Sequence, residues 1–203
     1  MKTFTLKADN QFKPSILDII SLYGLSGKDD SEGTISFKAT SMIPLGTFLK
    51  NNRGVLNYAT TLVLVYHLKL LIDLLERNNK TLRYLSMDDI QVVNNEIFLF
   101  TGYDQIVSGE VFEIVEPIDK KNPKLFLSPE LEDIKKLPTK ITFRSVYFSV
   151  GMLVVKCLLG EKINKKQRFF MKNTLGMILD TRLYWFISHC LEEDPEKRTL
   201  LFI

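Results

Sequence analysis

A long amphipathic stretch in the middle of the chain constrains the fold more than any other feature. Apolar side chains recur there at steps of three and four residues, which places them on one face of an α-helix: Leu62, Val65, Leu68, Ile72 and Leu75. Asn57 is a favourable N-cap residue, and the periodic pattern ends near Arg77. The sequence therefore predicts a helix over 57–77 whose apolar face is turned towards a protein core.

A second apolar run, Val146–Leu159, is too short to cross a bilayer and contains Lys156. We predict a buried core helix there and no membrane partner. The first residues, MKTFTLKADN, show no apolar segment of the secretory kind. The expected location is intracellular and cytoplasmic or, for a protein of viral origin, the virion or the host cytoplasm.

Composition sets further limits. The 203 residues include 27 basic and 24 acidic side chains and are 45% hydrophobic, which is enough apolar material for one domain with a real core. A net charge of +3 spread over both signs argues against a nucleic-acid partner. Cys157 and Cys190 form no metal-binding or disulfide pattern, as is usual in a reducing compartment.

The remaining elements indicate an α+β protein with a little β-structure in front and mostly helix behind. Strand-like alternation and a hairpin around Asn94-Asn95 predict strands over 3–8, 34–40, 90–93 and 96–100. Further helices are predicted over 14–23, 146–159 and 183–191. A polar turn, a connector broken by Pro44 and Gly46, and an irregular segment are expected at 27–33, 41–54 and 103–124.

Several segments resemble motifs of the eukaryotic-type protein kinases. LRYLSMDDIQVV, starting at Leu82, stands where kinases have H-R-D-L-x-x-x-x-N and the following strand. FLSPEL (126–131) resembles the A-P-E motif, and VYFSVGMLVVKCLLGE from Val146 resembles the central helix of the larger lobe. CLEEDPEKR (190–198) resembles the late C-x-x-x-D-P-x-x-R motif, and SMIPLGTFL (41–49) resembles the hinge and the start of the next helix.

The resemblance implies a single kinase-like domain over 1–203. A mostly helical C-lobe would occupy 41–203, and a reduced N-lobe containing β-strands would occupy 1–40. Forty residues are about half of what a five-stranded lobe with its helix needs. The phosphate-binding G-x-G-x-x-G motif does not occur in the sequence.

At the catalytic positions the family pattern is broken. Tyr84 stands in place of the H-R-D aspartate, and a phenol with an ordinary pKa near 10 is no proton acceptor at neutral pH. Asp89 takes the place of the metal-binding asparagine; it could hold Mg²⁺, but a capped turn is the favoured interpretation. Counting back from EIFLF puts Thr101 at the D-F-G aspartate, so the main metal site is expected to be lost.

The lysine that contacts phosphates in kinases has only a weak counterpart. FTLK could be matched to the V-A-I-K strand, which makes Lys7 a candidate remnant of cofactor binding. Asp18 is the one acid in the helix that follows, and an ordinary exposed lysine is the favoured interpretation of Lys7. The aspartate that opens the central kinase helix is replaced by Val146.

Architectural residues of the family persist. The resemblance implies an ion pair between Glu130 of the A-P-E motif and Arg198 of the D-P-x-x-R motif. Arg83 is the one member of the H-R-D triplet that remains. A sequence that keeps the architectural residues of the family but has lost its catalytic residues is typical of a pseudokinase.

We therefore expect a pseudokinase that uses no cofactor and no metal, with residual ATP binding the less favoured outcome. Its partner would be another protein, for example an active kinase or a larger assembly in which it serves as a scaffold. The alternative is a divergent active Ser/Thr kinase that uses Mg-ATP with Asp88, Asp89 or Asp104 in unusual roles. His67 and His189 are expected to be packing or surface residues, and the basic run 162–168 a solvated loop or a contact for an acidic partner.

Overall fold

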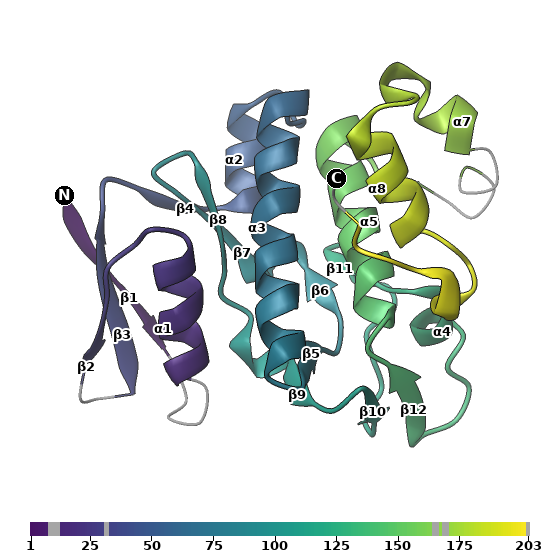
Figure 1. Ribbon diagram of the computed structural model, residues 1–203, viewed down its shortest axis with the longest axis horizontal. Coiled ribbons are helices and arrows are strands. Elements are labelled where there is room, and N and C mark those ends of the chain that lie inside the picture. The colour runs from purple at the N-terminus through teal and green to yellow at the C-terminus, as the bar shows by residue number, and fades with distance from the viewer. Residues whose placement is uncertain (8–12, 31–32, 164–166, 168–170, 202–203) are drawn as a thin grey trace.

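The N-terminal part of the chain is a small antiparallel sheet with one helix packed against it. The computed structural model describes residues 1–7, 13–30, 33–163, 167 and 171–201. The sheet has the order β1-β3-β2, with β1 at Lys2–Lys7, β2 at Gly27–Asp30 and β3 at Thr34–Ala39. Helix α1 (Lys13–Leu22) covers its apolar face (Figure 1).

A second three-stranded sheet joins this part to the rest of the chain. Its order is β4-β7-β8, with bounds Met42–Pro44, Ile90–Val93 and Ile97–Phe100. The predicted hairpin between β7 and β8 is confirmed, and Asn94 and Asn95 both have positive φ, as a type I′ turn requires. The Asn94 Oδ1 atom also accepts hydrogen bonds from the backbone N and Oγ1 of Thr40, at 2.7 and 2.8 Å.

The predicted central helix is confirmed as α3 (Tyr58–Arg77). The Asn57 side chain accepts a hydrogen bond from the Thr60 backbone N at 2.9 Å, which satisfies one of the free donors of the first turn. The apolar stripe faces β8 and α5, with Leu62 half-buried and the other four predicted residues buried. By length and composition α3 could cross a membrane, but its apolar face is buried within this protein.

Helix α5 (Ser145–Leu159) lies between α3 and α8 (Arg182–Cys190), as Figure 1 shows. Nearly every side chain of α5 is buried, which confirms the predicted core helix. Gly151 brings α5 and α8 close together, since an added Cβ would lie 2.7 Å from the Cys190 Cβ. A short helix, α2 (Leu45–Asn51), precedes α3.

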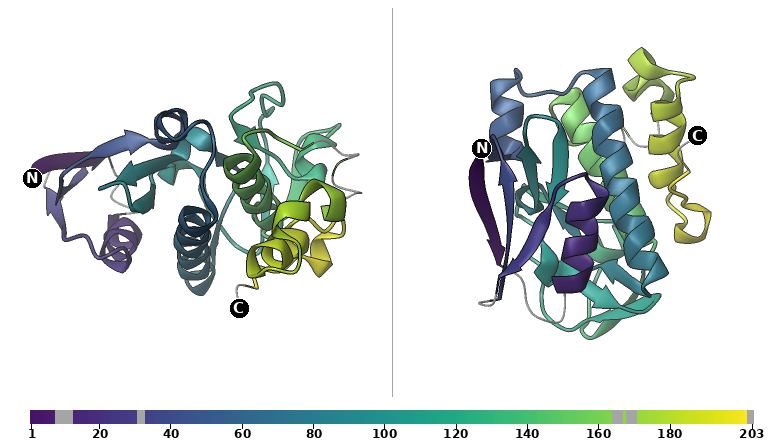
Figure 2. Two further views of the ribbon diagram at one scale, coloured as in Figure 1. Left: turned by 90° about the horizontal axis from the view of Figure 1, so that it is seen from above. Right: turned by 60° about the vertical axis from the view of Figure 1, so that its left-hand side comes forward.

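Short paired strands and turns surround the ends of these helices (Figure 2). Three two-stranded ladders are present: β5 (Lys80–Leu82) with β9 (Ile106–Ser108), β6 (Leu85–Ser86) with β11 (Leu125–Phe126), and β10 (Val111–Ile114) with β12 (Thr139–Thr142). Further helical pieces are α4 (Pro129–Glu132), α7 (Met171–Thr174) and the 3₁₀ turns Met87–Asp89, Tyr103–Gln105, Gly176–Ile178 and Pro195–Lys197.

The predicted α+β class is confirmed at this coarse level, and three local predictions are wrong. Residues 27–30 of the expected polar turn form β2, because pairing with β3 satisfies their backbone despite the polar side chains. The expected connector 41–54 contains β4 and α2; Pro44 stands at the N-cap of α2, where it removes no helical hydrogen bond. The expected irregular segment 103–124 contains β9 and β10, which pair with β5 and β12.

The two helical glycines Gly151 and Gly46 should respond oppositely to alanine. Gly151→Ala should lower the free energy of unfolding by about 1–3 kcal/mol, because the new methyl group would overlap Cys190 and Leu191. Gly46→Ala should raise it by about 0.5–1 kcal/mol, since its Cβ would meet only the Met87 sulfur at an ordinary 3.6 Å. Urea denaturation of both variants measures the difference, and equal effects would contradict the close packing of α5 on α8.

Candidate functional site

Tyr84, which the resemblance to kinases aligns with the catalytic aspartate, lies in the loop between β5 and β6. Its side chain is half-buried and packs against the small apolar cluster around β10 and β12. Burial raises the pKa of Tyr84, and the nearby negative charges of Asp104 and Asp89 raise it further. The phenol therefore stays protonated at neutral pH and supplies no general base.

Asp89 ends the 3₁₀ turn that follows, and the predicted capped turn is confirmed. The Ser86 backbone N donates a hydrogen bond to the Asp89 Oδ2 atom at 2.7 Å. In return the Ser86 Oγ atom accepts one from the Asp88 backbone N at 3.2 Å. This reciprocal arrangement is a capping box, and it commits one carboxylate oxygen of Asp89 to the main chain.

The structure brings Thr101 and Asp89 together, but through the backbone. The backbone N and the Oγ1 atom of Thr101 both donate to the Asp89 carbonyl oxygen, at 2.7 and 3.2 Å. Gly102 lies directly against the Asp89 carboxyl group, because a Cβ added to it would be 2.5 Å from the Asp89 Cγ atom. A side chain at residue 102 would thus displace the carboxylate.

The other two acids proposed for unusual catalytic roles also have partners. Asp88 forms an ion pair with Lys124 at 2.8 Å, with both side chains more than half exposed. The Asp104 Oδ2 atom accepts a hydrogen bond from the Gln105 Nε2 atom at 2.6 Å. Within the described residues, no three His, Cys, Asp or Glu side chains gather closely enough to hold a metal ion.

Asp89 has an unusual electrostatic environment for a carboxylate. Burial raises its pKa to about 6, and the charges of Asp104 and Asp88 act in the same direction against the hydrogen bond from Ser86. A group that titrates near pH 6 is partly protonated under mildly acidic conditions. Burial thus makes the ionised form that a magnesium ligand requires less favourable than it would be at the surface, although at pH 7 most of the group is ionised.

Lys7 is an exposed lysine, as the favoured interpretation predicted, and the N-terminal sheet contains a lysine–carboxylate pair at other positions. Lys7 and Asp18 are both exposed, and no ion pair between them is present. Instead, the buried Lys13 of α1 bonds Asp29 of β2 at 2.5 Å and the Asp30 carbonyl oxygen at 3.1 Å. Sequence reasoning missed this pair because it placed Asp29 in a turn and treated the segment before Pro14 as outside the helix.

The ion pair expected between Glu130 and Arg198 is present. The Arg198 Nη1 and Nη2 atoms lie 2.5 and 3.0 Å from the two carboxylate oxygens of Glu130, a bidentate geometry. The Arg198 side chain is 0% exposed and that of Glu130 22%. The pair fastens α4 to the segment that follows α8, although the two residues are 68 positions apart.

Three backbone carbonyl groups complete the environment of Arg198, and sequence reasoning missed all of them. The Nε atom donates to the Glu192 oxygen at 2.7 Å, and the Nη atoms donate to those of Glu193 and Arg144 at 3.0 and 3.3 Å. The guanidinium carbon also lies 5.0 Å from the centre of the Phe148 ring. Backbone acceptors leave no signal in residue types, so only the carboxylate partner could be inferred.

Arg83 lies beside Tyr84 at the mouth of a cavity of about 310 Å³. Its side chain is exposed, and its backbone N bonds the Gln105 carbonyl oxygen at 2.9 Å. The segment 113–119 forms the opposite wall and contributes three acids to it. Arg83 therefore stands at an open, charged surface and not in a buried clamp.

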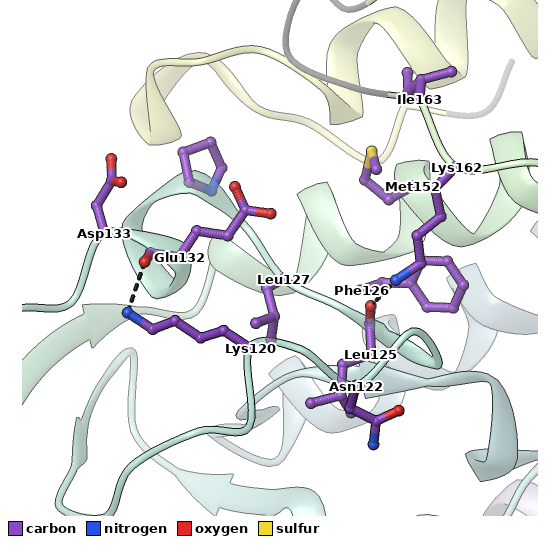
Figure 3. Close-up of a pocket in the computed structure, with 11 residues that line it drawn as sticks. Lys120, Asn122, Leu125, Phe126, Leu127, Glu132, Asp133, Met152, Lys162 and Ile163 are labelled. Carbon is purple, nitrogen blue, oxygen red and sulfur yellow. Dashed lines mark hydrogen bonds between the residues drawn. The ribbon is translucent and has the colours of Figure 1, made fainter.

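A second cavity, of about 240 Å³, lies between β11, α4 and the end of α5 (Figure 3). Its apolar wall includes Phe126 and Met152, and its rim carries lysines and acids. Lys162 donates to the Leu125 carbonyl oxygen and lies 4.6 Å from the centre of the Phe126 ring. Lys120 donates to two carbonyl oxygens of the α4 region, so both lysines hold neighbouring backbone in place.

The basic run 162–168 falls partly outside the described residues, at 164–166 and 168. Of the histidines, His67 is buried; its Nδ1 atom accepts a hydrogen bond from the Phe98 backbone N, and its carbonyl oxygen accepts one from the Tyr23 hydroxyl group. Burial lowers the His67 pKa to about 4, so the ring is neutral at pH 7. His189 contacts the Trp185 carbonyl oxygen, and the two histidines are packing and surface residues as expected.

No protein family and no curated protein matches this chain. The resemblance to kinases consequently rests on the residues of this chain alone.

Removing one side of the buried ion pair should be costly. Glu130→Ala should lower the free energy of unfolding by about 3 kcal/mol, because it leaves the buried Arg198 guanidinium without its counter-charge. The matched control Glu196→Ala removes a carboxylate that is 72% exposed and paired with Arg144, and should cost less than about 1 kcal/mol. Guanidinium denaturation provides the comparison; similar losses would show that the Glu130 pair contributes no more than a surface contact.

Asp89 should make stability depend on pH. Its pKa is about 6 in the folded protein against 3.8 as the ordinary value, so the folded state binds the proton more tightly. The contribution of Asp89 to stability is full below pH 4 and is lost as pH rises through 6. Asp89→Asn keeps an acceptor for the Ser86 backbone N and should remove this pH dependence. Between pH 4 and pH 7 the melting temperature of the variant should therefore rise relative to that of the parent protein. A constant difference would contradict the raised pKa.

Proposed function

We propose that this chain is a kinase-like protein without phosphotransferase activity, a pseudokinase that acts by binding another protein. The observation that carries the proposal is Tyr84, a protonated phenol at the position where the kinase pattern requires a carboxylate. Phosphoryl transfer to a hydroxyl group depends on a positioned proton acceptor, on metal ions and on a lysine at the phosphates. The residues of this chain favour none of these three.

The environment of Asp89 supports the same proposal. An aspartate that ligates magnesium needs both an ionised state and free oxygen atoms. Here one oxygen accepts a hydrogen bond from the Ser86 backbone N, and burial makes the ionised form less favourable than at the surface. At the position proposed for the principal metal ligand stands Thr101, whose hydroxyl group donates to a backbone oxygen.

Support for a kinase-like arrangement comes from the order and contacts of the elements. The Glu130–Arg198 pair joins two motifs in the way the family resemblance implies. After the proposed hinge, the elements follow along the sequence in the order α2, α3, the loop with Tyr84, the β7–β8 hairpin, α4 and the buried α5. We accordingly propose residues 41–203 as a C-lobe and residues 1–40 as a reduced N-lobe of one domain.

In this proposal the chain needs no cofactor, works in the cytoplasm and recognises a protein partner, such as an active kinase or a larger assembly. Its role would be to present binding surfaces to the partner, and the core and the Glu130–Arg198 ion pair would keep these surfaces in place. The cavity beside Arg83 and Tyr84 is one such surface, since it replaces a catalytic centre by an open pocket with acidic and basic walls.

The decisive measurement combines phosphotransfer with thermal stability in the presence of Mg-ATP. We expect no transfer of the γ-phosphoryl group to the chain itself or to a generic protein substrate, and no rise in melting temperature. A ligand at one hundred times its Kd would stabilise the folded state by about 2.7 kcal/mol, a shift that is easily seen. Turnover that disappears in Asp89→Ala, but persists in the exposed control Asp133→Ala, would establish the divergent active kinase instead.

A further inference from the structure

The N-terminal sheet ends in an open edge. In the order β1-β3-β2, all six residues of β1 pair with β3 on one side, from Lys2 opposite Ala39 to Lys7 opposite Thr34. No strand among the described residues pairs with the other side of β1. Figure 2 places β1 at the outer margin of the molecule, away from α5 and α8. An edge of this kind can accept the main chain of another segment.

The side chains of β1 alternate between two different surfaces. Phe4 and Leu6 point to the face that α1 covers; Leu6 is buried, while Phe4 is half-buried and stacks on Phe37 with ring centres 6.1 Å apart. Thr3, Thr5 and Lys7 are exposed on the opposite, outer face. An added strand would therefore place every second side chain beside apolar groups and the others beside polar ones.

The outer face of the sheet is positively charged. The strand register puts three exposed lysines on it, one from each strand: Lys7, Lys28 and Lys38. None of their ammonium groups has an ion pair or hydrogen bond with the rest of the described chain. Among the described residues of this sheet, Asp30 is the one carboxylate on this face. The described outer face therefore carries more positive than negative charge, and an acidic partner could supply the missing negative charges.

We propose that the β1 edge binds an extended acidic segment of a partner protein, with acidic and apolar residues in alternation. Main-chain hydrogen bonds to β1 would supply affinity, and the alternation would match the two faces. The carboxylates would face Lys7 directly and Lys38 across Thr3, whereas the apolar residues would extend the surface of Phe4 and Leu6. This inference deepens the proposed protein-binding function by naming the chemistry of the partner.

Charge favours an acidic segment over a second copy of the chain. Two copies joined through β1 would form one continuous sheet whose outer face carried the three lysines twice. Like charges on neighbouring strands destabilise a sheet, whereas opposite charges stabilise it. The same three lysines of the outer face therefore discourage self-association and favour an acidic partner.

The test uses the full chain and a fluorescently labelled octapeptide of alternating glutamate and valine, followed by fluorescence anisotropy. We expect binding that weakens with added salt, because screening reduces the attraction between exposed charges. Lys7→Glu should weaken binding about tenfold and Lys38→Glu about threefold, while the control Lys135→Glu, an exposed lysine near α4, should change it less than about twofold. Hydrogen exchange should slow in β1 when the peptide is added.

Two further peptides complete the test. An octapeptide with lysine in place of glutamate should not bind the parent chain but should bind Lys7→Glu, which keeps the result interpretable if reversal of charge perturbs the sheet. A glutamate–valine peptide methylated at alternate backbone nitrogens should not bind, because it cannot complete the main-chain ladder. Equal binding by Lys7→Glu, no protection of β1, or dimerisation through β1 without peptide would overturn the proposal.

Failure here can be distinguished from failure of the proposed function. The phosphotransfer assay reports on Tyr84 and Asp89, whereas the peptide titration reports on β1. An active kinase with an unchanged β1 edge would refute the pseudokinase and leave the edge site standing. An inactive chain that does not bind the acidic peptide would refute the edge site alone.

Discussion

The buried guanidinium group of Arg198 is the interaction on which the helical part of this molecule depends. A fully buried cation is stable only when its donors are satisfied, and here a bidentate carboxylate and three backbone carbonyl groups surround it. Those acceptors come from α4, from the start of α5 and from the segment after α8. One side chain thus fixes the position of three elements that are far apart in the sequence.

Near Tyr84, the carboxylates of Asp88 and Asp89 stabilise the fold at the surface of the molecule and in a turn. Here the carboxylate of Asp89 caps its own turn and lies against Gly102, and Asp88 pairs with a lysine at the surface. These two carboxylates hold the turn between β6 and β7 in place.

Much of the helical part could be predicted from the sequence, because burial leaves periodic patterns. The stripe of α3, the apolar run of α5 and the Asn94-Asn95 turn each identified an element correctly. The short strands β2, β9 and β10 were missed because their stability comes from distant partners, not from their own residues. Glu130 and Arg198 could be paired only through the resemblance to kinase motifs, and nothing in the residues around Lys13 and Asp29 indicated their pair.

The side-chain oxygen of Asn94 has a consequence for how the N-terminal sheet meets a partner. By accepting two hydrogen bonds from Thr40, it fixes the backbone at the junction between β3 and β4. The hydrogen bond from the Tyr23 hydroxyl group to the His67 carbonyl oxygen ties α1 to α3 at a second point. These bonds tie the sheet to the rest of the described chain, so in the proposed complex β1 would already be in place, and a docking strand would lose mainly its own conformational entropy.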